Sequence, residues 1–157
     1  MIHLWCFLVC LQTYLETPHS FFQALSCACS LSWRVWEEGY PLSQSLIKQT
    51  HQLLLSFGRG ALKSPGQFKN EQNYLADRFK QNILFVPISP EKLTDGIDDI
   101  FKYINEDSSP ALIKTAVAHV EFEALHPFKD GNGRIGRMII TLMLWSSGQI
   151  SSPRLYI

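Results

Sequence analysis

The chain has 157 residues, the size of one ordinary domain, and its 14 Lys and Arg residues balance 14 Asp and Glu residues. Zero net charge argues against a nonspecific nucleic-acid binder, because that affinity depends on surplus Lys and Arg. The 46% apolar content excludes an intrinsically disordered chain, which combines low hydrophobicity with high charge. We therefore expect a folded domain without a nucleic-acid partner.

The first 34 residues differ in composition from the rest. They hold only two charged side chains, Glu16 and Arg34, together with all four cysteines, which lack metal-ligand spacing. The apolar run at 4–11 is far shorter than the ~20 residues that span a bilayer, and no basic residue precedes it. We predict a poorly defined, non-secretory segment over 1–34, with a weak signal peptide as the alternative, and one domain over 35–157.

Apolar periodicity predicts two helices in the first half of that domain. The first opens at Pro41 and Ser43, ends at Gly58, and has the apolar stripe Leu46, Ile47, Thr50, Leu53, Leu54 and Phe57. Residues 61–90 lack this period and contain an extended run at 83–87, which predicts a β-hairpin. Pro90 opens the second helix, with the stripe Leu93, Ile97, Ile100, Phe101 and Ile104.

Two further helices are predicted in the second half. Ser109 and Pro110 fit the N-cap and first position of the third helix, which ends at Leu125 before Pro127. Its predicted core face is Ile113, Ala116, Val117, Val120 and Ala124. The fourth helix resumes at Gly133 or Arg134 and buries Ile135, Met138, Ile139, Leu142, Met143 and Trp145. The predicted fold class is mainly α, a helical bundle with one β-hairpin.

The loop between the last two helices has the residue types needed for phosphate chemistry. His126 can accept a proton near neutral pH, and Asp130 is a hard oxygen ligand suited to Mg²⁺. Gly131 and Gly133 leave backbone N–H groups unobstructed before a helix N-terminus, which favours anion binding. These features together indicate a phosphoryl- or nucleotidyl-transfer site.

Two arginines follow the glycines at positions 134 and 137. Residues three apart on a helix are neighbours, so Arg134 and Arg137 can bind several phosphate oxygens. Taken singly, a histidine at a helix end, a glycine-rich turn and two helix arginines are usually structural. Their occurrence within twelve residues favours the functional interpretation.

This segment, residues 126–137, resembles the signature of the Fic (filamentation induced by cyclic AMP) family, HxFx[DE]GNGRxxR, with every specified position filled. The resemblance extends over about residues 35–157, through stretches at 41–60, 65–68, 72–73, 85–87 and 154–156. It implies the Fic fold, a helical core with a β-hairpin flap beside the active-site loop.

The resemblance also implies an enzyme, a protein adenylyltransferase that transfers AMP from ATP to a Tyr, Thr or Ser hydroxyl of a target protein. His126 would be the catalytic base, and Asp130 would hold Mg²⁺. Phe128 would anchor the loop. The nucleotide and phosphate ligands would be Gly131, Asn132, Gly133, Arg134 and Arg137. The target-docking flap would include Gly66, Phe68, Gln72 and Asn73.

Several alternatives remain open at this stage. The same loop could transfer another nucleotide, phosphocholine or phosphate, or the chain could be an inactive remnant or binding module. The inhibitory pattern [ST]xxxE[GN] of many relatives does not occur, which predicts either an unrestrained enzyme or inhibition by a partner chain in trans.

His119 matches a helix histidine common in the family and is expected to be structural. Position 69 is Lys where the family often has Arg. We expect no membrane association and a cytoplasmic location, with export by a specialised route as the alternative.

Overall fold

The computed structural model describes residues 41–56, 61–79 and 81–151. These ranges contain four helices, α3 (Gln44–Leu55), α4 (Pro90–Glu106), α5 (Ala111–Leu125) and α6 (Asn132–Ser146), and two strands, β1 (Leu75–Ala76) and β2 (Ile83–Phe85). The predicted fold class, mainly α with one β-hairpin, is confirmed. The predictions for residues 1–34, Phe57 and 154–156 lie outside the described residues.

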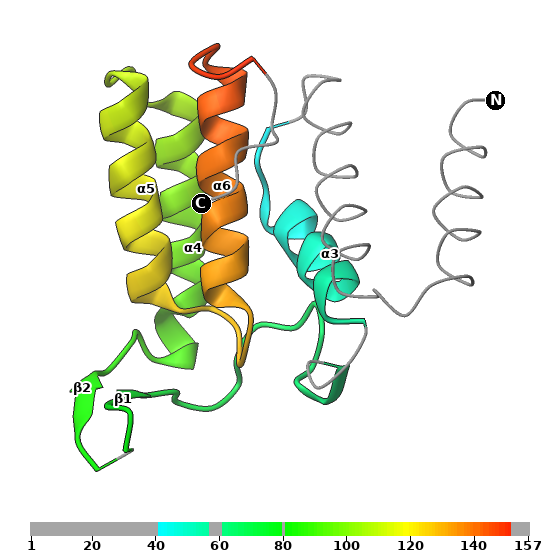
Figure 1. Ribbon diagram of the computed structural model, residues 1–157, viewed down its shortest axis with the longest axis vertical. Helices are drawn as coiled ribbons and strands as arrows, with labels where there is room; N and C mark the ends of the chain where they lie inside the picture. Colours follow the sequence, from blue (N-terminus) through cyan, green and yellow to red (C-terminus); the bar gives the residue numbers. More distant parts are fainter. Residues whose placement is uncertain (1–40, 57–60, 80, 152–157) are drawn as a thin grey trace, which may run out of the picture.

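Helices α4, α5 and α6 lie side by side and form the body of the molecule, with α3 beside α6 (Figure 1). The connection between α5 and α6 lies at the same end of this body as the hairpin. The fold thus brings the histidine-containing loop and the hairpin to one end of the bundle.

A single apolar core holds the helices together, and most of the predicted stripes face it. All five predicted residues of α4 are buried, as are Leu46, Ile47, Thr50 and Leu54 of α3. In α6 the buried set is Ile135, Met138, Ile139, Leu142 and Met143, whereas Trp145 is only partly buried. Leu53 is 36% exposed, contrary to prediction, because it lies about 100° around the helix from Leu54, at the edge of the stripe.

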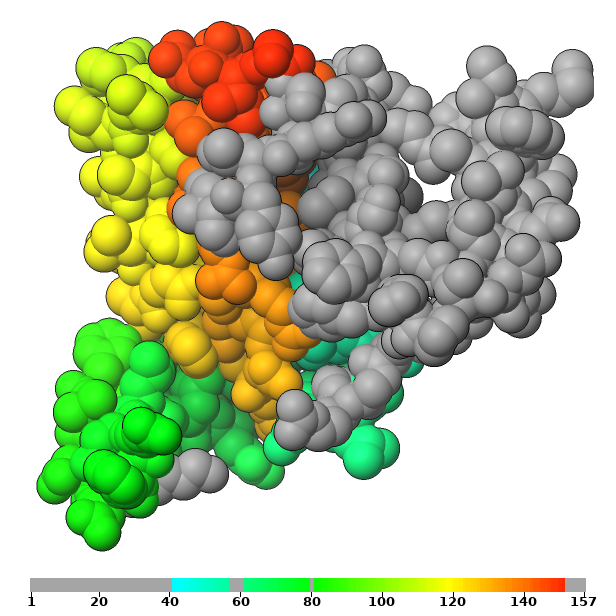
Figure 2. Space-filling model, in the orientation of Figure 1, coloured from blue at the N-terminus to red at the C-terminus, as the bar shows by residue number. Residues whose placement is uncertain are grey.

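The predicted core face of α5 is wrong. Ile113, Val117 and Val120 are 57%, 41% and 64% exposed. Ala116 is also exposed, and Ala124 is only partly buried. The face that packs on α4 and α6 is instead Thr115, Ala118, Phe122 and Leu125. Both faces of α5 are apolar, so periodicity alone could not select the buried one. Burial of the large Phe122 ring decides it, and α5 forms one edge of the molecule (Figure 2).

Two helix starts differ from the prediction by one or two residues. Pro110 is the N-cap of α5, and Ser109 lies outside the helix, where its N–H donates to Asp107 Oδ1 at 2.7 Å. Helix α6 begins at Asn132, because Gly131 at φ 82° supplies the left-handed N-cap. By contrast, Ser43 caps α3 as a typical N-cap, accepting a bond from Leu46 N.

The hairpin is short, irregular and exposed. Strands β1 and β2 pair antiparallel, with Leu75 opposite Phe85 and Ala76 opposite Ile83, so the register shifts within two residues. The Asp77 N–H donates to the Asn82 carbonyl at 3.0 Å and closes the turn. Every residue of both strands is exposed, so the hairpin stands out from the bundle body (Figure 2).

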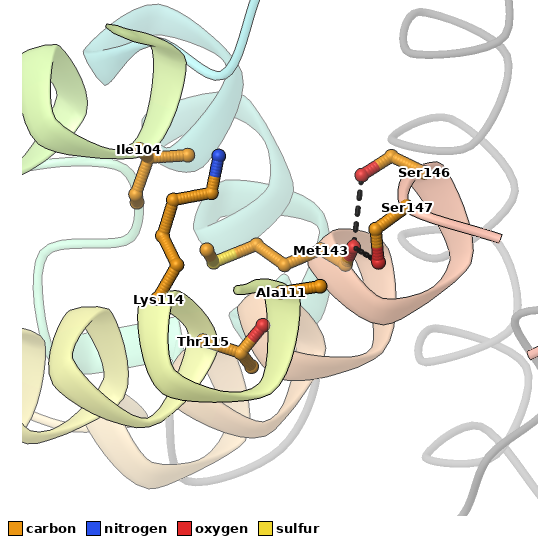
Figure 3. Close-up of a pocket in the computed structure, with 7 residues that line it drawn as sticks. All are labelled: Ile104, Ala111, Lys114, Thr115, Met143, Ser146 and Ser147. Carbon is orange, nitrogen blue, oxygen red and sulfur yellow. Dashed lines mark hydrogen bonds between the residues drawn. The ribbon is translucent and has the colours of Figure 1, made fainter. Parts of the chain in front are cut away.

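A small pocket lies at the other end of the bundle, where α5 begins and α6 ends (Figure 3). Its volume is about 50 Å³, and it is lined by Ile104, Ala111, Lys114, Thr115, Met143, Ser146 and Ser147. The buried Thr115 hydroxyl has no hydrogen-bond partner among the described residues. A water molecule needs about 10–15 Å³ of such space, so this pocket accommodates water and is too small for a nucleotide.

The α5 correction gives a direct stability test. Phe122→Ala should lower the free energy of unfolding by about 3–5 kcal/mol, because it removes a fully buried ring. Val120→Ala, two residues away on the exposed face, should change it by less than about 0.5 kcal/mol. Urea unfolding of both variants measures the difference, and equal losses would contradict the assigned burial.

Candidate active site

His126 lies at the junction between α5 and the loop, in an unusual backbone conformation. It is the C-cap of α5 with φ 46° and ψ 60°, the left-handed region that few non-glycine residues adopt. Its N–H still donates to the Phe122 carbonyl at 3.1 Å, and the rigid Pro127 follows it. Such strain persists only where the surroundings hold the chain in place.

Two side chains from the segment before the hairpin supply much of that restraint. Lys69 Nζ donates to the Leu125 carbonyl at 3.0 Å, and Asn73 Nδ2 donates to the His126 carbonyl at 3.1 Å. The backbone N–H of Lys69 donates to the Pro127 carbonyl at 2.8 Å. Lys69 Nζ also donates to Asn73 Oδ1 at 2.8 Å, which joins the two side chains that bind the loop. Burial lowers the pKa of the Lys69 ammonium to about 8, so it remains mostly charged at neutral pH.

Asn132 fastens the middle of the loop from the other side. Its Oδ1 accepts from the Phe128 N–H at 2.8 Å, and its Nδ2 donates to the Phe128 carbonyl at 2.8 Å. The Phe128 ring is fully buried in the core. The structure therefore places the Asn132 side chain against the loop backbone, which leaves its main-chain N–H as the group that could donate to an anion.

His51 of α3 joins the loop to the segment that precedes the hairpin. Its Nδ1 accepts from the Gly66 N–H at 2.8 Å, so its Nε2 carries the proton that reaches the Asp130 carbonyl at 2.9 Å. Its ring stacks on Phe128 with centroids 3.7 Å apart and an interplanar angle of 7°. Burial is the main cause that lowers the pKa of His51, which keeps the imidazole neutral in the tautomer that these two bonds require.

The His126 imidazole is partly buried and also favours the neutral form. Burial lowers its pKa most strongly, while the carbonyl and carboxylate of Glu123 oppose that shift. The nearby Lys69 charge lowers the pKa further. His126 Nδ1 is buried and makes no hydrogen bond of normal geometry within the part of the chain that the structure describes, so the Glu123 carbonyl acts on its pKa as a nearby dipole. A neutral imidazole can accept a proton at neutral pH.

The start of α6 combines helix N–H groups with an ion pair. The first N–H groups of an α-helix have no acceptor within the helix, and here they belong to Asn132 and Gly133. Asp130 Oδ1 accepts from the Gly131 N–H at 2.6 Å and lies 3.4 Å from Arg134 Nη2. Arg134 is thereby held beside the helix N-terminus, where the dipole and two nearby arginines favour an anion.

The residues predicted to form the target-docking flap lie mostly against the loop. Gly66 is buried beside His51, and the Phe68 ring packs on Phe128 with centroids 5.3 Å apart. Gln72 Nε2 donates to the Pro87 carbonyl at 2.8 Å, joining the two ends of the hairpin. Asn73 Nδ2 also lies 3.3 Å from the Phe128 carbonyl. These four residues support the loop and the base of the hairpin, and their role toward a target stays a prediction.

Helices α5 and α6 approach closely at two glycines. A Cβ on Gly136 would collide with Glu123 Oε1 and would lie 3.1 Å from the His119 ring. A Cβ on Gly133 would lie 3.6 Å from Arg137 Nη1 and 3.9 Å from Glu123 Oε1. The glycines thus form a notch in α6 that admits the polar side chains of α5.

Local sequence patterns do not point to His51 or Glu123, although both lie close to the loop or to the start of α6. His51 could have been noticed as a titratable side chain on the apolar face of the first helix, one turn after Ile47. Glu123 stands three residues before His126 in the last turn of α5, while His126 itself lies outside the helix. The sequence marks Lys69 only as a departure from the family pattern, because its partners lie far along the chain.

Within residues 41–56, 61–79 and 81–151, no group of three or more His, Cys, Asp or Glu side chains converges as a metal site. A single carboxylate, Asp130, remains available at the loop, 47% exposed. None of the helices described is long and apolar enough to cross a bilayer.

Comparison with known proteins relates this site to one family. The profile described as "Fic/DOC family" matches residues 41–144. Protein adenylyltransferase fic-1 of Caenorhabditis briggsae is 28% identical over 123 residues, which cover 76% of this chain and 22% of that protein. The probable protein adenylyltransferase aq_aa38 of Aquifex aeolicus (strain VF5) is 34% identical over 68 residues, covering 43% of this chain and 21% of that protein.

A solved structure shows the same fold. A Fic domain containing signaling protein from Bacteroides thetaiotaomicron superposes with a TM-score of 0.72 at 21% identity, covering 88% of this chain and 55% of that one. The chain therefore spans about a fifth of the length of the two curated relatives and about half of this structure.

The His51 contacts predict a stability loss that depends on pH. His51→Phe keeps a ring against Phe128 but leaves the Gly66 N–H and the Asp130 carbonyl without this partner. The free energy of unfolding at pH 7.5 should therefore fall by about 2 kcal/mol or more. In the native protein the lowered His51 pKa means that unfolding takes up a proton below about pH 6.5, so stability falls on acidification. The variant should lose part of this pH dependence.

Urea unfolding at pH 7.5 and pH 5.5 measures both effects. Gln49→Ala, on the exposed side of the same helix, is the control and should behave like the native protein. A His51→Phe protein with native stability and native pH dependence would refute the assigned bonds.

Proposed function

The chain belongs to the Fic/DOC family, and we propose from this that it is a protein adenylyltransferase. It transfers AMP from ATP to a Tyr, Thr or Ser hydroxyl of a target protein and releases pyrophosphate. The observation that carries the proposal is that one short loop places a neutral histidine, at the end of α5, close along the chain to two arginines on the first turns of α6. The adenylyltransferase names of the curated relatives support it.

His126 is the general base in this proposal. Its neutral imidazole accepts the proton of the target hydroxyl while that oxygen bonds to the α-phosphorus of ATP. The bond from this phosphorus to the bridging oxygen of the β-phosphate breaks, and pyrophosphate leaves. Lys69 and Asn73 donate hydrogen bonds to the carbonyls of Leu125 and His126. These bonds hold the strained main chain of His126 and so fix the position of its imidazole.

The N-terminus of α6 binds the phosphates. The main-chain N–H groups of Gly131, Asn132 and Gly133 form the anion hole, and Arg134 and Arg137 neutralise the remaining charge. The Gly131 N–H donates to Asp130 Oδ1 at 2.6 Å, so this N–H can bind a phosphate oxygen only when the carboxylate moves away from it. Most of the catalytic effect is expected from this charge neutralisation and from alignment of the reacting groups.

Asp130 fits the role of a magnesium ligand that acts together with the substrate. Mg²⁺ prefers oxygen ligands and is usually held by one or two carboxylates and by the phosphates themselves. The half-exposed Asp130 carboxylate, beside the helix N-terminus, supplies one such oxygen. When bound, Mg²⁺ would offset charge on the α- and β-phosphates.

The hairpin is proposed to dock the target protein. Its exposed strands carry large apolar side chains, among them Ile83 at 61%, Leu84 at 69% and Phe85 at 45% exposure. An extended segment of the target can pair with such an edge through main-chain hydrogen bonds. The flap residues Gly66, Phe68, Gln72 and Asn73 would set the position of this edge relative to His126.

Substitution of the proposed base separates chemistry from binding. His126→Ala should reduce AMP transfer by about 10²–10⁴-fold, because general-base assistance is lost, while ATP affinity stays close to native. Calorimetric titration with ATP and Mg²⁺ measures the affinity. Loss of ATP binding by a folded His126→Ala protein would contradict the assigned role.

The transferred group itself can be identified with two labels. The chain is incubated with a cell lysate and ATP labelled at either the α- or the γ-phosphorus, and the modified proteins are analysed by mass spectrometry. The control is the same lysate with the His126→Ala protein, which gives the labelling caused by enzymes of the lysate. Adenylyl transfer by this chain adds label from the α-phosphorus alone above that control and places AMP on a hydroxyl side chain. Additional label from the γ-phosphorus would show phosphoryl transfer and overturn the proposal.

A further inference from the structure

The Asp130 carboxylate contacts two of the groups that the proposed function assigns to phosphate. Its Oδ1 accepts from the Gly131 N–H at 2.6 Å and lies 3.4 Å from Arg134 Nη2. Arg134 Nη2 also lies 3.4 Å from the position of a Cβ on Gly131, so the guanidinium and this N–H converge on one carboxylate oxygen. A negatively charged oxygen of the chain itself is therefore bound where anion donors of the loop meet.

The main chain of Asp130 is held in place, whereas its side chain has room to turn. The Asp130 carbonyl is bonded to His51 Nε2 at 2.9 Å, and Gly131 follows as the N-cap of α6 at φ 82°. The Asp130 side chain itself is 47% exposed. Rotation of this side chain to another rotamer therefore releases the Gly131 N–H without a change in the loop backbone.

Building on the proposed function, we propose that Asp130 makes the site selective for magnesium-bound ATP over free ATP. A free triphosphate has to displace a carboxylate of the same sign from the Gly131 N–H and from Arg134, which costs charge-assisted contacts and brings negative groups together. A magnesium-bound triphosphate carries a cation that attracts the carboxylate away from these donors. Asp130 thus excludes the wrong ligand as well as binding the right one.

Two variants separate this role from simple repulsion between Asp130 and an anion. A carboxylate that only repels the anion acts through its charge, which Asp130→Asn and Asp130→Ala both remove. A carboxylate that competes for the Gly131 N–H also acts through its oxygen. The Asn side chain keeps an acceptor oxygen in that position, whereas Ala has none. Competition therefore predicts a difference between the two variants, and repulsion alone predicts none.

Calorimetric titration with ATP in EDTA and with ATP and Mg²⁺ tests the proposal. For metal-free ATP, Asp130→Asn should bind more tightly than the native protein, and Asp130→Ala should bind roughly three- to tenfold more tightly again, because the Gly131 N–H is released. Both variants should lose most of the native preference for magnesium-bound ATP. The matched control is Glu71→Gln, which neutralises an exposed carboxylate 3.6 Å from Lys129 of the same loop and should keep that preference.

Hydrogen exchange without nucleotide keeps this inference separate from the proposed function. The Gly131 amide should exchange slowly in the native protein and in Asp130→Asn, and faster in Asp130→Ala, while unchanged exchange in the middle of α6 shows that the variants are folded. If the native chain transfers no AMP, the proposed function fails, while exchange and metal-free binding still test Asp130. Equal Gly131 exchange in the native protein and Asp130→Ala, or equal affinity of the two variants for metal-free ATP, would overturn the inference.

Discussion

The site depends on a set of hydrogen bonds that satisfy the backbone carbonyls of the loop after α5. The carbonyls of Leu125 and His126 lie at the end of α5, and they accept hydrogen bonds from Lys69 and Asn73. A buried carbonyl without a partner costs about 1–3 kcal/mol, so these bonds determine whether the loop can hold its shape. The left-handed conformation of His126 is stable only because its surroundings are fixed in this way.

The same set of bonds links rigidity to electrostatics. His51 must remain neutral to accept from the Gly66 N–H and donate to the Asp130 carbonyl, whereas Lys69 donates as an ammonium. The buried Lys69 ammonium and the buried neutral ring of His51 therefore both hold the loop by hydrogen bonds. The helix N-terminus of α6 and the arginines of its first turns are the groups to which phosphate binding is assigned in the proposed function. Different residues therefore hold the loop and are proposed to bind phosphate.

The sequence was sufficient to predict the parts of the structure that depend on neighbouring residues. The apolar stripe of α4 and the N-cap Ser43 depend on local spacing, and so does the segment 126–137, which the family resemblance also indicated. The buried face of α5 could not be predicted, because Val120 and Phe122 lie on opposite apolar sides. His51 and Glu123 were missed for a different reason: their partners are on other elements, and no local pattern identifies such contacts.

The hydrogen bonds that hold the loop join residues far apart along the chain, and this has a kinetic consequence. Helices α4, α5 and α6 follow one another directly, so their mutual contacts close short segments. The bonds that shape the loop join residues 53, 56 and 79 positions apart, from Asn73 to His126, Lys69 to Leu125 and His51 to Asp130. Closing longer segments costs more chain entropy. The bundle can therefore assemble early, and the loop acquires its final shape only when the segments that carry His51, Lys69 and Asn73 dock onto it.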